Sequence, residues 1–423
     1  MTPAKFFWYD TSYYGSSGTN TMGRLVAAGT CQSNISCAGN SVVIEEFGYS
    51  PRGELTDVWE STPHSGGWYH TTGSYWAHGG LNTLGLLSNS GGSLIPLQTY
   101  GLDGEGRVTK VTASSGQNPV TGVTYTTSGT TQPIGSLTQA SFGSGDSDTF
   151  SYATNTGRLT QYKFNMNTLS VTGNLTWNAS GSLKTLSITD QVNTANSQTC
   201  NYTYDNLARV KTANCGTIWN QTFNPDAFGN LTKTATVGIS FLPTYSLSTN
   251  HYQSVSGCTP SYDANGFATN DCAHSYTWDA AGNPRSVDTV NLTYDALGRV
   301  VEQAVGSVFT EIVYNPTGGK LALMNGQTLQ KAFVPLPAGA TAVYTSTGLA
   351  YYRHADWLGS SRFSDHPQPD EVLRRGVRAL WRELRGLGHH GPELHRPEPG
   401  HGVRTLRFSL PRIQSGARPL ALA

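Results

Sequence analysis

The sequence predicts an all-β protein built from consecutive antiparallel β-hairpins, and three observations predict it. Only 13% of the 423 residues are charged, whereas 48 glycines, 21 tyrosines and 9 tryptophans are present. An aromatic residue followed by Asp or Asn and then Gly recurs along the chain, for example at Trp278, Tyr294 and Tyr314. Between these points apolar and polar residues alternate, which is typical of half-buried strands. We therefore expect a spiralling strip of hairpins from the first residue to Arg362.

Composition excludes several other classes of protein. Disordered chains are usually highly charged and poor in aromatic residues, unlike this one. The formal net charge is zero, so we expect no nucleic-acid partner and no attraction to anionic membranes. No run approaches the ~18 apolar residues of a membrane span. The chain begins in strand-like sequence without an export signal, and we expect the natural N-terminus to lie upstream.

The repeated unit has a chemistry that explains its residues. Its clearest copies begin at Tyr204, Tyr262, Trp278 and Tyr294, and looser copies begin at Tyr9, Tyr49, Tyr100, Tyr152, Trp177, Asn224 and Tyr314. The aromatic residue ends one strand and buries a large area. The carboxylate after it accepts hydrogen bonds from backbone amides two residues on, and glycine supplies the left-handed conformation of a type I turn with a bulge. We expect hairpin tips at Asp205, Asp263, Asp279 and Asp295, with Gly266, Gly282 and Gly298 in the left-handed position.

Six cysteines fall into three near pairs, Cys31/Cys37, Cys200/Cys215 and Cys258/Cys272. None has the spacing of a zinc site, so local disulfides formed in an oxidising compartment are the preferred interpretation. Six cysteines allow 15 pairings, and free buried thiols remain the alternative.

The quoted units resemble the RHS/YD-repeat family, whose repeats follow the form YDxxGRL. The segment YYRHADWLGSSR, from Tyr351 to Arg362, is similar to the YxxxDHLGSxR segment of the RHS core, with Trp357 in place of the usual His. The resemblance divides the chain into a degenerate hairpin region (1–200), clear repeats with the start of the core (201–362) and a tail (363–423). It implies a partial hollow β-shell, which in bacterial members encloses a C-terminal toxin and in teneurins serves cell adhesion. The paired aspartates that release the cargo in the family would follow Arg362, and we expect no such cleavage here.

The tail has a different composition from the rest of the chain. Residues 370–423 contain ten of the nineteen arginines and no Lys, Tyr or Asn. One interpretation is a basic amphipathic helix that binds a membrane surface or a partner. The alternative, which we favour, is a change of reading frame between Phe363 and Glu371, because the shifted frame can encode the YAPFGE, FTGQ and YSPxxGRW elements of the RHS core. The tail would then be irregular or weakly helical, without an evolved function.

Candidate catalytic residues all have simpler interpretations. Asp10 and the repeat aspartates occupy turn positions, where capping explains them. Glu45 and Glu46 lie on an apparent strand and are interpreted as a solvated edge. His64, His70 and His78 lie near one another in the sequence, but without matching Cys or carboxylate spacing we expect a polar strand pair and no metal.

We therefore predict a non-enzymatic fragment of a secreted or cell-surface shell without cofactors, acting in toxin delivery, adhesion or wall association. Exposed Trp and Tyr make carbohydrate or other surface ligands conceivable partners. The alternative is a β-solenoid or propeller protein that binds or degrades polysaccharide. That alternative requires carboxylates that converge away from the turns, whereas a shell should carry its aspartates at hairpin tips.

Overall fold

The computed structural model describes residues 4–11, 18–31, 41–128 and 132–367, and it confirms the all-β prediction. In these residues the regular structure consists of β-strands and two short 3₁₀ turns, η1 (Thr194–Asn196) and η2 (Pro337–Gly339). The described residues contain no helix of the length and apolarity needed to span a membrane. The predicted change of reading frame concerns a tail that lies almost entirely outside the described residues.

The first sheet has eighteen strands. They are β1 (Ala4–Tyr9), β2 (Leu25–Cys31), β3 (Ser41–Tyr49), β4 (Leu55–Ser61), β5 (Tyr69–Tyr75), β6 (Leu81–Leu87), β7 (Gln98–Leu102), β8 (Val108–Ala113), β9 (Val120–Tyr125), β10 (Leu137–Phe142), β11 (Ser147–Tyr152), β12 (Leu159–Met166), β13 (Leu169–Trp177), β14 (Leu183–Asp190), β15 (Gln198–Tyr204), β16 (Val210–Asn214), β17 (Asn220–Pro225) and β18 (Leu231–Thr234).

Two small hairpins and a second, ten-stranded sheet follow. The hairpins are β19 (Thr244–Tyr245) with β20 (Tyr252–Ser254), and β21 (Ser261–Tyr262) with β22 (Ala268–Asn270). The second sheet comprises β23 (Tyr276–Trp278), β24 (Pro284–Val287), β25 (Val290–Tyr294), β26 (Val300–Val305), β27 (Val308–Tyr314), β28 (Lys320–Asn325), β29 (Thr328–Pro335), β30 (Thr341–Thr345), β31 (Gly348–Ala355) and β32 (Ser361–Asp365).

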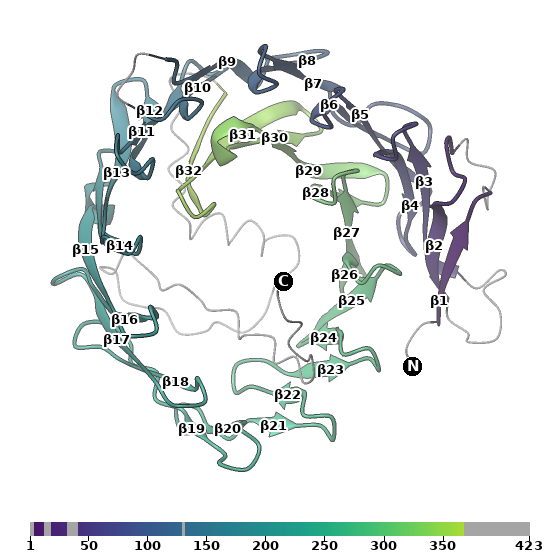
Figure 1. The fold of residues 1–423 in the computed structure, drawn as a ribbon. Helices are drawn as coiled ribbons and strands as arrows, with labels where there is room; N and C mark the ends of the chain where they lie inside the picture. The colour runs from purple at the N-terminus through teal and green to yellow at the C-terminus, as the bar shows by residue number, and fades with distance from the viewer. Residues whose placement is uncertain (1–3, 12–17, 32–40, 129–131, 368–423) are drawn as a thin grey trace.

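Strand order in both sheets follows chain order, because each strand pairs antiparallel with the next one along the chain. This connection needs only short turns, so the chain forms a ribbon of consecutive hairpins. The ribbon curls through most of a circle and then runs inside its own first strands (Figure 1). The second sheet, green to yellow in Figure 1, therefore lies within the curve of the first.

The hydrophobic core lies between these two layers. Alternating side chains on the strands that line the core point into it, as on β12, where Tyr162, Phe164 and Met166 are buried and the residues between them are half-buried. The largest cluster joins β5–β10 of the outer layer to β27–β31 of the inner layer. Hydrogen bonds also cross between the layers, from the Tyr69 hydroxyl to the Gly326 carbonyl (2.6 Å) and from the Tyr100 hydroxyl to the Pro335 carbonyl (3.0 Å). The fold is thus a two-layer spiral, with sheet packed on sheet.

The regions bounded at residues 200 and 362 rest on the clarity of the repeats and stay a prediction. Strand pairing continues through residue 200, and the interruption of the ribbon lies between Thr234 and Tyr276. The last strand, β32, extends past Arg362 to Asp365, and its Phe363 side chain is buried in a second core cluster with Tyr162 and Phe164.

Candidate functional site

The repeat aspartates lie at hairpin tips and cap them. At Asp205, one carboxylate oxygen accepts from the backbone amides of Leu207 and Arg209, both at 2.9 Å. The carboxylates of Asp263, Asp279 and Asp295 each accept from the amide of the residue four positions on, at 2.7 to 2.9 Å.

The glycine of each repeat occupies the left-handed region that its turn requires. Gly266, Gly282 and Gly298 have φ of 84°, 81° and 87°. In the repeat at Asp205 this position is held by Ala208, with φ of 60°. A residue with a Cβ atom is disfavoured there, so this tip carries backbone strain that the glycine-containing tips avoid.

In nine of the described hairpins the aromatic residue at the end of the first strand joins the hairpin to the previous one. Its polar group donates to the backbone carbonyl of the first residue in the returning strand of the preceding hairpin. The donor–acceptor pairs, all at 2.7 to 2.9 Å, are Tyr49–Leu25, Tyr125–Val108, Tyr152–Leu137, Trp177–Leu159, Tyr204–Leu183, Tyr245–Leu231, Trp278–Ala268, Tyr294–Pro284 and Tyr314–Val300. Tyrosine and tryptophan both carry a donor and phenylalanine does not, which explains the residue types at these positions.

All the repeat tips lie on one rim of the ribbon. Each tip connects an odd-numbered strand to the next even-numbered strand, and successive turns of an antiparallel ribbon alternate between its two edges. The turn aspartates are therefore spread along this rim, one for each hairpin. The four predicted repeat aspartates are all described, and of these Asp295 alone is fully buried. The inner layer brings its tip against the outer sheet.

The tip at Asp295 forms an ionic contact between the layers. The Arg299 guanidinium pairs with Asp295 (2.6 Å) and also contacts the Glu45 carboxylate on β3, 254 positions away in the chain. The same guanidinium lies over the Tyr314 ring, 4.6 Å from its centroid.

The prediction that Glu45 and Glu46 form a solvated edge is wrong. Their exposed fractions are 0% and 1%; β3 lies between β2 and β4, and Glu45 contacts Arg299 of the inner layer. The strand pattern SVVIEEFGY conceals this burial, since two adjacent carboxylates ordinarily indicate exposure.

Four buried glutamates converge between the layers, away from the turns. Glu45 lies directly opposite Glu60 in the β3–β4 pair, and Glu302 lies directly opposite Glu311 in the β26–β27 pair. All four are at most 3% exposed. Like charges at such positions repel, so this arrangement is stable only if some of the carboxyl groups are protonated.

Burial raises the pKa of three of these glutamates. It raises the pKa of Glu45 to about 8, and the Arg299 charge offsets only part of that effect. Burial, together with the neighbouring Glu45, also raises the pKa of Glu60 well above its usual range. Burial raises the pKa of Glu311 to about 7. The sequence signal for the cluster was weak: Glu311 stands within the apolar strand VFTEIVY, where an isolated charge indicates a buried partner.

A second ionic cluster closes the end of the inner layer. His354 on β31 contacts Asp148 on β11 through Nδ1 and Asp365 on β32 through Nε2, both at 2.8 Å. The rings of Phe142, Phe164 and Phe363 surround the imidazole. Burial disfavours the charged imidazolium, but the two carboxylates outweigh it and raise the pKa of His354 well above its ordinary value. Sequence reasoning missed this cluster, because its members lie 206 residues apart along the chain.

The three histidines singled out in the sequence do not share a site. His64 pairs with Glu302 (2.9 Å), His70 pairs with Asp57 (2.9 Å), and His78 contacts the Gly106 carbonyl (3.2 Å). Among the described residues, no group of three or more His, Cys, Asp or Glu side chains is arranged to hold a metal ion.

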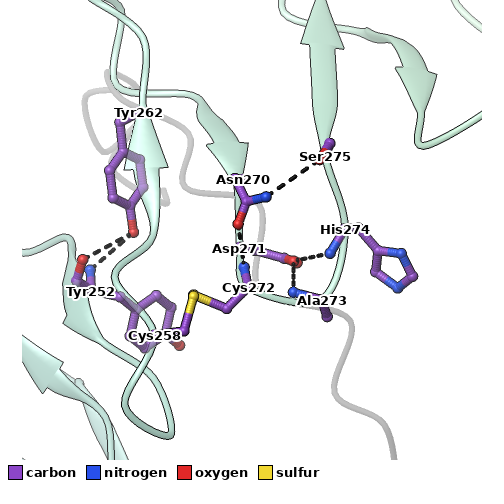
Figure 2. The surroundings of a disulfide bond; sticks show 9 residues. All are labelled: Tyr252, Cys258, Tyr262, Asn270, Asp271, Cys272, Ala273, His274 and Ser275. Carbon is purple, nitrogen blue, oxygen red and sulfur yellow. Dashed lines mark hydrogen bonds between the residues drawn. A yellow bond between two sulfur atoms is a disulfide. The ribbon is translucent and has the colours of Figure 1, made fainter. Parts of the chain in front are cut away.

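Two of the predicted cysteine pairs are disulfides. Cys200–Cys215 lies one step beyond the last paired residues of the β15–β16 ladder, and its Cα atoms are 4.0 Å apart. Cys258–Cys272 joins two loops on the rim opposite the repeat tips, with Cα atoms 5.9 Å apart (Figure 2). Cys31 is buried on β2, and Cys37 lies outside the described residues.

The hairpins form a curved shell in which side-chain hydrogen bonds join one hairpin to the next. Comparisons with known proteins agree with this architecture. A family model described as Teneurin YD-shell matches residues 145–320. A mutant Tc holotoxin pore from Photorhabdus luminescens matches with a TM-score of 0.61 at 15% identity, over 87% of this chain and 22% of that chain. Crystal structures of TcdB2-TccC3-Cdc42 and TcdB2-TccC3 match with TM-scores of 0.60 at 16% and 15% identity, each over 86% of this chain and 22% and 23% of theirs. No curated protein matches the sequence.

Residues 145–320 are thus similar to the Teneurin YD-shell family, and the chain shares its fold with the solved Tc toxin structures. It spans about a fifth of the length of the solved chains that it resembles.

Proposed function

We propose that this chain forms part of the wall of a secreted or cell-surface YD-shell that encloses a protein cargo, and that it is not an enzyme. The observation that carries the proposal is the curvature of the ribbon, which curls through most of a circle while its inner layer packs against the concave face of the outer layer (Figure 1). A wall of this kind separates an interior volume from solvent. In bacterial members of the family, such a volume holds a toxin.

The polar residues of the repeats support a structural role for the wall. The aspartates accept the hydrogen bonds that cap the turns, and the aromatic side chains donate hydrogen bonds to the preceding hairpins. Each of these groups has its hydrogen-bond partner within the wall itself, which supports a structural role.

The alternative of a polysaccharide-degrading enzyme requires converging carboxylates away from the turns. Glu45, Glu60, Glu302 and Glu311 converge in this way, but they are at most 3% exposed and lie between two packed sheets. A glycosidase needs two carboxyl groups that flank a bound sugar ring, and a sugar ring has no access to these side chains. We therefore assign the cluster to the cohesion of the layers.

Enclosure can be tested with a reporter. A short protease-sensitive peptide is fused after the last residue of the full chain, and its cleavage by trypsin is compared with that of the free peptide. Because the chain supplies only part of the wall, the proposal predicts partial protection, that is, slower cleavage of the fused reporter than of the free peptide, together with small-angle scattering of a curved, open particle. Cleavage at the rate of the free peptide and scattering of a solid particle would overturn it. Hydrolysis of a polysaccharide panel that Glu60→Gln abolishes would establish the enzyme instead.

Carbohydrate binding is a second candidate, favoured by the edge strand β1. Its Phe7, Trp8 and Tyr9 side chains are 44% to 56% exposed, which is suited to stacking on sugar rings. Binding to a glycan array that is lost in the double variant Trp8→Ala/Tyr9→Ala would support this role, and an array without signal would exclude it.

A further inference from the structure

The ribbon has a weak segment between its two sheets. From Thr234 to Tyr276 the hairpins β19–β20 and β21–β22 form separate two-stranded sheets. Single backbone bridges, Lys233 to Phe241 and Asn270 to Ser275, link them to the neighbouring sheets. Two side-chain bonds, from Tyr245 to Leu231 and from Trp278 to Ala268, are added to these bridges. Isolated two-stranded hairpins are at most marginally stable, so this segment needs additional links.

The weak segment also lacks a hydrophobic core. Between Cys215 and Val290, where every residue is described, no hydrophobic side chain is buried apart from those of Pro243 and Pro260. Large apolar side chains of the segment are exposed instead, including those of Leu242 and Leu247. Segments with few buried apolar contacts open at low free-energy cost.

A disulfide lies at the centre of this segment (Figure 2). Cys258 is in the loop between β20 and β21, and Cys272 is in the loop between β22 and β23, so the bond spans the hairpin β21–β22. Beside it, the Tyr262 hydroxyl accepts from the Tyr252 amide at 3.1 Å. This bond is one of the few other links between the hairpins β19–β20 and β21–β22. Cys272 has a φ of 74°, and its amide donates to the Asn270 side chain at 2.8 Å.

The two described disulfides differ in access. Cys258 is exposed, whereas Cys200 and Cys215 are 1% and 3% exposed inside the eighteen-stranded sheet. The two disulfides do not differ in the length of the loop that they close, because their cysteines are 14 and 15 residues apart. A thiolate must reach a sulfur atom to attack it, so access decides which bond reacts first.

We propose that Cys258–Cys272 is a thiol-reducible staple that holds the weak segment closed, and that its reduction opens the ribbon between the two sheets. The reductant is a low-molecular-weight dithiol or a thioredoxin-type protein dithiol. Its thiolate attacks Sγ of Cys258, the disulfide breaks, and Cys272 leaves as a thiolate that takes up a proton. The second thiol of the reductant then attacks the mixed disulfide, which releases Cys258 as a thiol and leaves the reductant oxidised.

The consequence for the shell rests on the proposed enclosing function. A shell that is stable in an oxidising environment would open at this segment on reaching a reducing compartment. Along the chain, this segment is the connection between the inner layer and the outer layer. Loss of the staple therefore lets the backbone between the two sheets extend, while the strand pairing within each sheet stays intact.

The test compares the two disulfides in the intact full chain. Dithiothreitol is titrated, new thiols are trapped with iodoacetamide, and each cysteine peptide is quantified by mass spectrometry. We expect Cys258 and Cys272 to be alkylated at least tenfold faster than Cys200 and Cys215. Equal rates for the two pairs would overturn the proposal.

Hydrogen exchange then tests the opening. The variant Cys258→Ser/Cys272→Ser should show at least tenfold faster amide exchange over residues 244–276 without reductant, and dithiothreitol should accelerate exchange there no further. The matched control Cys200→Ser/Cys215→Ser should leave exchange over these residues unchanged. Unaltered exchange in reduced wild-type protein would refute the staple even if neither variant folds. Because exchange and alkylation do not depend on cargo, they report on the staple separately from the protection of the reporter.

Discussion

The Tyr314 hydroxyl donates to the Val300 carbonyl across 2.9 Å, from the end of the first strand of one hairpin to the start of the returning strand in the hairpin before it. The same relationship recurs at Tyr294 with Pro284 and at Tyr204 with Leu183. It links each repeat to its neighbour by a side chain in addition to the backbone ladder. The cohesion of the ribbon therefore depends on the polar atom of the aromatic residue as well as on its ring.

Removal of this hydroxyl should weaken the wall measurably. The variant Tyr314→Phe keeps the ring under Arg299 and loses only the donor, so we expect a loss of about 1 kcal/mol in the free energy of unfolding. Urea denaturation followed by tryptophan fluorescence measures it. Tyr9→Phe serves as the control, since Tyr9 is 56% exposed, and should change stability by less than about 0.5 kcal/mol. Equal effects of the two changes would contradict the role of the hydroxyl.

Backbone strain at one tip should be correctable. Ala208 occupies the left-handed position at φ of 60°, so Ala208→Gly should raise the stability of the protein by up to about 1 kcal/mol. The reverse change, Gly298→Ala, should lower stability by at least ~1 kcal/mol. A Cβ atom at Gly298 would meet nothing within 4 Å, which leaves backbone conformation as the cause. Thermal unfolding of both variants checks the pair, and a shift of the same sign in both would refute the assignment.

The buried glutamates should make stability depend on pH. The pKa of Glu45 is raised to about 8 in the folded protein, so its neutral form is favoured there. The stabilisation is complete below the unfolded pKa of about 4.5 and is lost as pH rises through about 8. The free energy of unfolding should therefore fall between pH 5 and pH 8.5, by as much as ~1.4 kcal/mol per pH unit for this group.

The variant Glu45→Gln mimics the neutral carboxyl and should flatten that decline. Urea unfolding at intervals of one pH unit measures it, with the exposed tip residue Glu105→Gln as the control. An unchanged slope in Glu45→Gln would show that the pH dependence arises elsewhere.

The buried His354 cluster should be intolerant of losing one partner. Asp148→Asn removes a charge from a fully buried pair, and such changes cost about 3–5 kcal/mol. Because His354 and Asp365 lie on β31 and β32, hydrogen exchange should accelerate first in these two strands. The apolar triple variant Asp148→Leu/His354→Phe/Asp365→Leu should recover most of the loss, because it leaves no unpaired buried charge. If Asp148→Asn were as stable as the wild type, the cluster would not contribute to the cohesion of the layers.

The cluster also contributes to the pH response with the same sign. The pKa of His354 is raised above its ordinary value by Asp148 and Asp365, against the effect of burial. Its stabilisation is present below about pH 6.5 and is lost as pH rises through the raised pKa. The histidine ring signals in an NMR titration should show His354 still protonated at pH 7, and a neutral ring at that pH would contradict the assignment.

Local chemistry made the hairpins predictable from sequence. The step from aromatic residue to carboxylate to glycine specifies a capped turn within a few residues, so tips such as that at Asp263 and Gly266 follow from short-range rules. The all-β class follows from the same rules, repeated along the chain. The sequence also suggested close cysteine pairs, because their partners are separated by only 14 or 15 residues.

The curl of the ribbon could not be predicted by those rules, because the twist of each strand pair accumulates over many hairpins before the inner layer meets the outer one. That meeting alone decides that Glu45 faces Arg299 and that Asp148 faces His354, across 254 and 206 positions of the chain. A charged residue on a strand is ordinarily exposed, and only a second sheet packed over it reverses that expectation. The sequence by itself determined the hairpins and their tips, whereas the tertiary structure decided which polar groups are buried, since burial depends on the layer that arrives from elsewhere in the chain.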